Sequence, residues 1–99
     1  PCIVFGLGGI YAEAMKDVAF MEAPANKKMV VEMIKRLKSS KIFEGERGIK
    51  INYDRLVDTI VKLSNFIYAH KDHVKEIEIN PVIVNEKNVI GLDALIVNY

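Results

Sequence analysis

The chain has 99 residues, of which 51% are hydrophobic, and its 14 basic and 13 acidic residues leave a formal net charge of +1. This length suits one small domain or a piece of a larger one, and the hydrophobic content excludes wholesale disorder. The balanced charge argues against a dedicated nucleic-acid binder, because such domains usually carry a clustered basic excess. No stretch approaches 18 consecutive apolar residues, so we expect no membrane-spanning segment.

The only cysteine, Cys2, excludes an internal disulfide and fits a reducing, cytoplasmic setting. Because Cys2 lies in an apolar stretch, we expect it to be an inert core residue rather than a nucleophile. The sequence has no initiator methionine and no signal peptide, and it opens directly into this stretch. We therefore expect the 99 residues to belong to a longer protein.

Residues 2–5 are predicted to form a buried strand, and the segment Gly6–Gly9 that follows contains three glycines. Glycine permits a positive φ and the close approach of backbone to a ligand. The spacing matches neither the dinucleotide fingerprint nor the P-loop, so a bulge or turn between strands is an equal alternative. Residues 10–21 then suggest a hairpin turning at Lys16-Asp17, although the first part of this stretch could favour helix.

Two amphipathic helices are predicted in the middle of the chain. The first begins after an N-cap at Asn26 and ends near Ser39-Ser40, and the second covers residues 53–69 after an N-cap at Asn52. Apolar residues recur at helical spacing in both, namely Met29, Val30, Met33, Ile34 and Leu37 in the first and Leu56, Ile60, Leu63 and Ile67 in the second. We expect the methionines to fill the core.

Three polar residues in the connections have a functional and a structural interpretation. Arg47, flanked closely by glycines, could contact a phosphate or could simply face solvent. His70 and His73 follow the second helix with no carboxylate or cysteine at ligand spacing, so we expect them to be solvated.

The last quarter of the chain is predicted to form two strands joined by a polar turn at Asn85–Asn88. A turn closed on Glu86 and Lys87 sets Val84 against Val89, Val82 against Gly91, and Asn80 against Asp93. Directly opposed residues share a face, with Cβ atoms about 4.5–5.5 Å apart. Strand, hairpin, two helices and hairpin in this order predict an α+β fold, an antiparallel sheet covered on one face by two helices.

Strand alternation gathers Glu78, Asn80 and Asp93 on one face, with Gly91 leaving room beside them. These three hard oxygen donors form a half-shell suited to Mg²⁺. The alternative is the solvated face of a half-covered sheet. Against that alternative, four apolar residues share this face (Val82, Val89, Leu95 and Val97), and Asn80 and Asp93 are poor strand formers. A register shifted by one residue is an alternative, because Glu-Lys is not a favoured hairpin turn.

The sequence resembles the C-terminal portion of the ATP-grasp domain of ADP-forming acyl-CoA (acetyl-CoA) synthetases, relatives of succinyl-CoA synthetase β-subunits. Three segments carry the resemblance, Pro1–Pro24, Phe43–Gly48 and Glu76–Val97. The most specific pattern is the Glu-x-Asn-Pro of residues 78–81 followed by Asp93. With the helices in matching order, the resemblance covers essentially the whole chain.

The resemblance implies that Glu78, Asn80 and Asp93 hold the Mg²⁺ that bridges the phosphates of ATP or ADP, with Glu78 counted as catalytic. It also implies that Gly8, Gly9, Glu13 and Asp17 line the nucleotide or phosphohistidine side, although Glu13 and Asp17 could otherwise be surface charges. Arg47 matches a family arginine to which we assign no role.

The implied activity is that of an acid–CoA ligase, acyl-CoA + ADP + phosphate ⇌ carboxylate + CoA + ATP. The family reaction proceeds through a phosphohistidine on a CoA-binding subunit or domain, so a hetero-oligomer is expected. The upstream half of such a domain lies outside these residues, so we expect the isolated chain to be inactive and to bind ATP weakly. Two alternatives stay open: the ATP-grasp regulatory portion of a protein-lysine acetyltransferase, and a non-catalytic interaction module.

Overall fold

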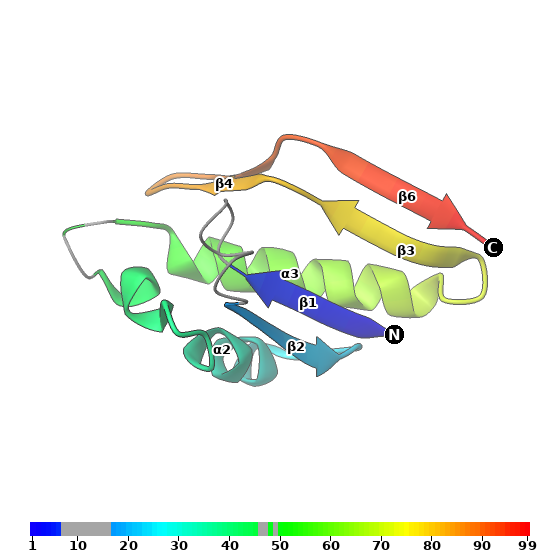
Figure 1. Ribbon diagram of the computed structural model, residues 1–99, viewed down its shortest axis with the longest axis horizontal. Coiled ribbons are helices and arrows are strands. Elements are labelled where there is room, and N and C mark those ends of the chain that lie inside the picture. The colour runs from blue at the N-terminus through cyan, green and yellow to red at the C-terminus, as the bar shows by residue number, and fades with distance from the viewer. Residues whose placement is uncertain (7–16, 46–47, 49) are drawn as a thin grey trace.

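The computed structural model describes residues 1–6, 17–45, 48 and 50–99 of the chain. Its elements in order are β1 (Cys2–Gly6), β2 (Val18–Glu22), α2 (Lys27–Lys35), the 3-10 helix η1 (Ser40–Glu44), α3 (Tyr53–Ala69), β3 (Val74–Ile79), β4 (Val82–Val84), β5 (Val89–Gly91) and β6 (Ala94–Asn98). Figure 1 shows the strands in one layer and the helices behind and below them. The predicted α+β class is therefore confirmed.

Both helices begin at the asparagine that the sequence predicts. The Asn26 side chain accepts a hydrogen bond from the backbone N–H of Met29 at 2.9 Å, and the Asn52 side chain accepts one from the N–H of Arg55 at 3.1 Å. Each cap satisfies a backbone donor that has no partner within the helix. The bounds of α3 agree with the prediction, whereas α2 ends at Lys35, four residues before the expected Ser39.

The core lies between the two helices and the inner face of the strands. Val30, Met33 and Ile34 of α2 are almost fully buried, as is Leu56 of α3, and the helices pack against each other. Met29 is 36% exposed, so only one of the two methionines predicted for the core, Met33, is buried. Burying such side chains is the main favourable term in folding, about 1.5–3 kcal/mol for each aliphatic side chain that leaves water.

A buried serine ties the start of α2 to α3. Ser64 is fully buried, and its hydroxyl accepts a hydrogen bond from the N–H of Ala25 at 3.1 Å. The same hydroxyl lies 2.8 Å from the carbonyl oxygen of Val61, to which it donates. Both polar functions of the group are therefore satisfied inside an otherwise apolar contact.

β1 and β2 form an antiparallel ribbon in which Ile3 pairs with Met21, Val4 with Phe20 and Phe5 with Ala19. The inner face carries Ile3 and Ala19, which are buried. The outer face is open, with Val4 65% and Phe20 62% exposed. The prediction that residues 2–5 form a buried strand is therefore confirmed for the strand and its inner face, and wrong for its outer face.

Cys2 lies on that open face and its side chain is exposed, so the prediction that it is a core residue is also wrong. The apolar pattern of residues 2–5 predicted a strand, but it gave no sign of which face would be covered. The predicted pairing of Val18–Met21 with residues 10–15 falls outside the described residues, and the partner that the structure shows for β2 is β1.

β3, β4, β5 and β6 form one long hairpin, bent where β3 passes into β4. The sheet β3–β6 pairs Ile77 with Ile96 and Ile79 with Ala94, and the short ladder β4–β5 pairs Val82 with Gly91. Figure 1 shows the hairpin running along α3, with its turn beyond β4 and its open end beside the C-terminus. The predicted register is confirmed from the pair Val84–Val89 to the pair Glu76–Val97, and it shifts by one residue between Glu76 and Val74.

Candidate functional site

The turn of the long hairpin is held by its own first asparagine. The Asn85 side chain accepts hydrogen bonds from the N–H groups of Lys87 at 2.9 Å and Asn88 at 2.8 Å. The Asn85 N–H donates to the carbonyl of Asn88 at 3.0 Å. An Asx turn of this kind replaces the glycine that a two-residue hairpin usually needs. It explains why Glu86-Lys87 forms a turn and why the register does not slip.

The start of α3 fixes this turn in space. The N–H of Asn52 donates to the carbonyl of Asn85 at 2.8 Å. The guanidinium of Arg55 donates to the carbonyl of Lys87 at 2.8 Å and to the side chain of Asn88 at 2.9 Å. A planar guanidinium suits such a double contact. The hairpin that carries the predicted metal ligands is therefore anchored at its tip.

The backbone brings Asn80 opposite Asp93, as the sequence predicts. The N–H of Asn80 donates to the carbonyl of Asp93 at 3.1 Å, and the N–H of Leu92 donates to the carbonyl of Pro81 at 3.0 Å. These two bonds join the ladder β3–β6 to the ladder β4–β5 across the bend. Glu78 follows on β3, where it pairs with Leu95. The three predicted ligands thus occupy adjoining register positions.

At this bend the residue positions that face the core and those that face outward are exchanged, which the sequence did not predict. Ile77 packs toward the core with Ile79 on the same side of β3, so Glu78 faces outward. Simple alternation would then place Val84 and Val89 outward as well, but both pack against the core. The change falls at Asn80-Pro81, whose peptide bond is cis.

Gly91 therefore does not leave room beside the acidic residues. A Cβ added at Gly91 would lie 2.7 Å from Cγ2 of Ile79, on the helix side of the hairpin. Val82, which pairs with Gly91, and Val89 likewise do not share the face of Glu78. The prediction that these residues complete the polar face is wrong. Glycine at position 91 instead permits the close approach of Ile79.

Glu78, Asn80 and Asp93 are all exposed to solvent. One Asp93 carboxylate oxygen accepts a hydrogen bond from the N–H of Ala94 at 2.9 Å. Two carboxylates and a carboxamide are the hard oxygen donors that Mg²⁺ prefers, so the donor set fits that ion. Within residues 1–6, 17–45, 48 and 50–99, no three His, Cys, Asp or Glu side chains lie close enough to hold a metal ion. The predicted set contains only two carboxylates and takes the Asn80 amide as its third donor, and its role as a metal site stays a prediction.

Asp17 is buried and its contacts are with the protein. Its exposed fraction is 6%, and its two carboxylate oxygens accept hydrogen bonds from the N–H groups of Lys38 at 2.6 Å and Ser39 at 3.0 Å. The adjacent Ser39 hydroxyl and these two N–H groups lower the pKa of Asp17 from its ordinary value, although burial acts in the opposite direction. Asp17 is thus not a surface charge, and it joins the start of β2 to the turn between α2 and η1.

The Ser39 hydroxyl is buried with no aligned hydrogen-bond partner among the residues that the structure describes. It lies beside the Asp17 carboxylate, toward which its O–H can turn, and this explains its effect on that pKa. The role of Asp17 toward a nucleotide stays a prediction. Gly8, Gly9 and Glu13, the other residues predicted to line the nucleotide or phosphohistidine side, lie outside the described residues, as does Arg47, to which no role is assigned.

His70 and His73 are exposed, as predicted. The ring of His70 lies against that of Phe66, with centroids 4.4 Å apart. Across the described segments, no helix is long and apolar enough to cross a membrane.

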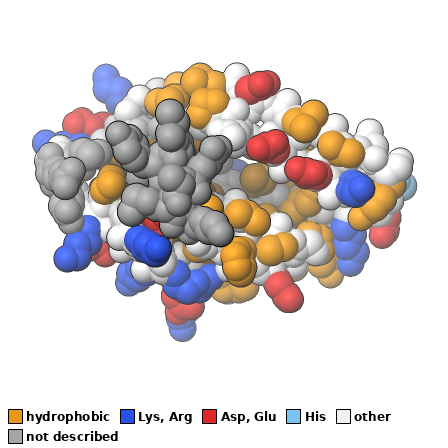
Figure 2. Space-filling model, viewed as in Figure 1, with side chains coloured by type: hydrophobic (Ala, Val, Ile, Leu, Met, Phe, Trp, Pro, Cys, Tyr) orange, Lys and Arg blue, Asp and Glu red, His pale blue; other side chains and the backbone are white. Residues whose placement is uncertain are grey.

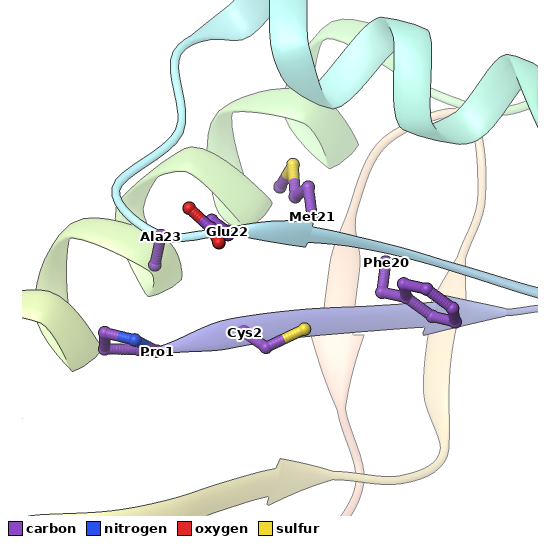
Figure 3. Close-up of a pocket in the computed structure, with 6 residues that line it drawn as sticks. All are labelled: Pro1, Cys2, Phe20, Met21, Glu22 and Ala23. Carbon is purple, nitrogen blue, oxygen red and sulfur yellow. The ribbon is translucent and has the colours of Figure 1, made fainter.

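A shallow depression lies on the β1–β2 ribbon. It has a volume of about 800 Å³ and is lined by Pro1, Cys2, Phe20, Met21, Glu22 and Ala23. Figure 3 shows Phe20 lying over β1 on the side of the Cys2 thiol, while Met21 points toward the helices. The depression contains none of the predicted ligands, so it is distinct from the site on the long hairpin.

Comparison with known proteins places the chain in a family. A family model described as an ATP-grasp domain matches residues 1–97. The chain is 42% identical over 95 residues to subunit beta of the ADP-forming acetate–CoA ligase I of Pyrococcus furiosus, covering 95% of this chain and 40% of that subunit. It is also 42% identical over 87 residues to the ADP-forming acetate–CoA ligase of Methanocaldococcus jannaschii, covering 86% of this chain and 12% of that protein.

Solved structures agree with this assignment. A Pyrococcus horikoshii protein has a TM-score of 0.92 and 34% identity, over 99% of this chain and 42% of its own. An acetyl-coenzyme A synthetase of Candidatus Korarchaeum cryptofilum, in complex with coenzyme A and Mg-AMPPCP, has a TM-score of 0.89 and 31% identity, over 100% of this chain and 46% of its own.

The chain belongs to the ATP-grasp domain family. Within that family it is similar to ADP-forming acetate–CoA ligases and spans less than half the length of the relatives it matches.

Two residues that matter for the site were missed in the sequence. Arg55 lies in the second predicted helix, and nothing in its spacing links it to a turn more than thirty positions away. Asn85 carried a usable signal, because an asparagine at the first position of a turn is typical of an Asx turn.

Proposed function

We propose that these residues form the part of an ADP-forming acyl-CoA synthetase that holds Mg²⁺ and the phosphates of ADP or ATP. The reaction of the intact protein is acyl-CoA + ADP + phosphate ⇌ carboxylate + CoA + ATP. The observation that carries the proposal is the hairpin register, which sets Asn80 opposite Asp93 with Glu78 next in line on β3. The similarity to ADP-forming acetate–CoA ligases supports the reaction class.

Within the proposal, Glu78 and Asp93 supply negative charge to the cation and Asn80 supplies a neutral oxygen. When bound, Mg²⁺ neutralises phosphate charge and orients the phosphoryl group for transfer. The contribution of the chain is to hold the three side chains on a hairpin whose tip is fixed by Arg55. Donors fixed in advance cost little reorganisation when the charge of the reacting group changes.

The remaining parts of the reaction are assigned to polypeptide beyond residues 1–99. One relative was solved with a phosphohistidine segment pointing towards its nucleotide-binding site. By analogy, we propose that a CoA-binding subunit or domain delivers a phosphohistidine to the nucleotide held here, in a hetero-oligomer or a longer chain in the cytoplasm. His70 and His73 are not assigned this role, because they lie in the connection after α3, away from the predicted ligands in sequence.

The proposal is tested by replacing Asp93 with Asn in the intact protein and measuring ATP formation from acetyl-CoA, ADP and phosphate. The change keeps the size of the side chain but removes one of two charges, so we expect kcat to fall by about 100-fold or more. The matched control is Asp72→Asn, an exposed acid outside the hairpin ladder. Equal turnover in the Asp93 variant and the control would contradict the proposal.

A further inference from the structure

The three predicted metal ligands stand on both sides of the bend in the long hairpin. Glu78 belongs to the ladder β3–β6, whereas Asn80 and Asp93 lie where this ladder meets the ladder β4–β5. The N–H of Asn80 donates to the carbonyl of Asp93 at 3.1 Å. The N–H of Leu92 donates to the carbonyl of Pro81 at 3.0 Å, and these two bonds join the ladders. The angle between the ladders therefore affects how far the Asn80 amide and the Asp93 carboxylate lie from Glu78.

In the proposed site the cation lies on the outer face of the strands. Glu78 faces outward, because Ile77 before it packs toward the core. Figure 2 shows acidic side chains gathered over the β3–β6 half of this face. Mg²⁺ demands nearly ideal octahedral geometry, with its ligands at about 2.0–2.1 Å. A small displacement of one oxygen donor therefore weakens the site.

Beyond the bend, β4, β5 and the turn between them form an arm, residues 82–91, that lies over the start of α3 (Figure 1). Val84 and Val89 pack against the core beneath the arm. Apolar contacts support the arm without fixing its direction, because the hydrophobic effect is not directional. Directional contacts are found at its tip, where the N–H of Asn52 donates to the carbonyl of Asn85 at 2.8 Å and Arg55 adds two more hydrogen bonds.

Arg55 makes both of its contacts with the tip through a single nitrogen. Its Nη1 donates to the carbonyl of Lys87 at 2.8 Å and to the side-chain oxygen of Asn88 at 2.9 Å. The backbone of Arg55 is itself fixed, because its N–H donates to the capping side chain of Asn52 at 3.1 Å. The hydroxyl of Thr59 donates to its carbonyl at 2.7 Å. The guanidinium therefore holds the tip of the arm from the rigid first turn of a helix.

A contact at the tip is well placed to fix the angle at the bend, because the arm is long. Asn85 lies five residues after Asn80, about 16 Å along a strand that rises about 3.3 Å per residue. A shift of about 3 Å at the tip would turn the arm by about 10° and move an atom about 5 Å from the bend by about 1 Å. The groups of a functional site must be held within about 0.5 Å of their productive positions. Loss of the contact is therefore large enough to be felt by the metal ligands.

We propose that Arg55 is a positioning residue for the metal site. It holds the arm at the angle at which Asn80 and Asp93 meet the divalent ion together with Glu78. Arg55 acts through the hairpin and contacts neither the ion nor the nucleotide. This inference rests on the proposed function, and its signature is a higher requirement for Mg²⁺ when the contact with the tip is lost.

The test measures ATP formation by the intact protein at increasing Mg²⁺ concentration, with ADP, acetyl-CoA and phosphate saturating and the temperature well below Tm. In Arg55→Ala we expect the half-saturating Mg²⁺ concentration to rise about tenfold, the lower end of the cost of losing a group that orients metal ligands. At saturating Mg²⁺, kcat should return to within about threefold of the parent. Arg55→Lys offers no planar guanidinium to the two acceptors and should give an intermediate value. The matched control is Arg36→Ala, an exposed arginine that bonds the carbonyl of Phe20 at 2.7 Å, and its Mg²⁺ requirement should equal that of the parent.

Asn88→Ala keeps the inference testable if Arg55→Ala does not fold, because it removes one acceptor and leaves the backbone bonds of the turn in place. In the double variant we expect a rise in the Mg²⁺ requirement smaller than the product of the two single effects, since either change breaks the same contact. A requirement within about twofold of the parent in Arg55→Ala and Asn88→Ala, or an equal rise in the Arg36→Ala control, would overturn the inference. That result leaves the proposed function standing, which fails instead if Asp93→Asn keeps the turnover of its own control.

Discussion

Replacing Asp17 separates a structural role of this carboxylate from a role in nucleotide binding. Asp17→Asn keeps one oxygen but turns the other acceptor into an NH₂ group that faces the N–H of Lys38 or Ser39. A hydrogen bond to a charged group contributes about 1.5–3 kcal/mol, and the variant loses one such bond and the charge of the other. We therefore expect the free energy of unfolding to fall by about 2–3 kcal/mol.

The assay is thermal unfolding followed by the helical circular dichroism signal. For a chain of this size, 1 kcal/mol corresponds to about 4–8 °C in Tm, so the variant should melt roughly 10–20 °C lower. The control is Asp58→Asn, which removes an exposed ion pair to Lys27 at 3.2 Å and should change stability by less than about 1 kcal/mol.

The pH dependence gives a second readout of the same group. The pKa of Asp17 is lower in the folded protein than its ordinary value of 3.8, so the unfolded chain binds the proton more readily. The stabilisation is therefore complete above that ordinary value and is lost as the pH falls toward the folded pKa. Asp17→Asn should flatten this acid limb. A Tm within 2–3 °C of the parent, combined with an unchanged acid limb, would refute the structural role of Asp17.

The remaining predictions concern the hairpin, its contact with α3, and the buried serine that joins α3 to the start of α2. Arg55→Ala removes both hydrogen bonds to the turn and should raise amide exchange at Asn88 by about tenfold, with Arg55→Lys intermediate; equal protection in all three proteins would show that the anchor is unimportant. Gly91→Ala should cost about 1–3 kcal/mol in urea unfolding because its Cβ meets Cγ2 of Ile79, and Ile79→Leu, which lacks that methyl, should restore part of the loss. Ser64→Ala leaves a buried N–H without its acceptor and should cost about 1–3 kcal/mol, whereas a loss below 0.5 kcal/mol would argue against this contact.

The register of the hairpin could be predicted from the sequence because the residues that close the turn fix which residues pair along the two strands. Once the turn closes on Glu86 and Lys87, the pairing of Val82 with Gly91 and the opposition of Asn80 and Asp93 follow. The helix starts were predictable for a similar reason, since an asparagine cap acts within three residues of its own position.

The faces of the hairpin could not be predicted in the same way. Period-two alternation assumes an unbroken strand, and here the alternation changes at Asn80-Pro81, so that Val84 and Val89 turn toward the core. The contacts of Asp17 and Arg55 were also out of reach, because each joins segments that are distant in sequence. The exposure of Cys2 depends on what covers the outer face of β1, which no pattern within residues 2–5 records.

We propose that a divalent ion carrying the nucleotide phosphates sits between Glu78, Asn80 and Asp93. This placement is tested by adding Mn²⁺ and ADP to the isotope-labelled intact protein and following paramagnetic broadening of its amide signals. Mn²⁺ occupies the oxygen-donor sites that suit Mg²⁺. We predict that the signals of these three residues broaden first. Early broadening elsewhere, with Asn80 and Asp93 still sharp, would contradict the assignment.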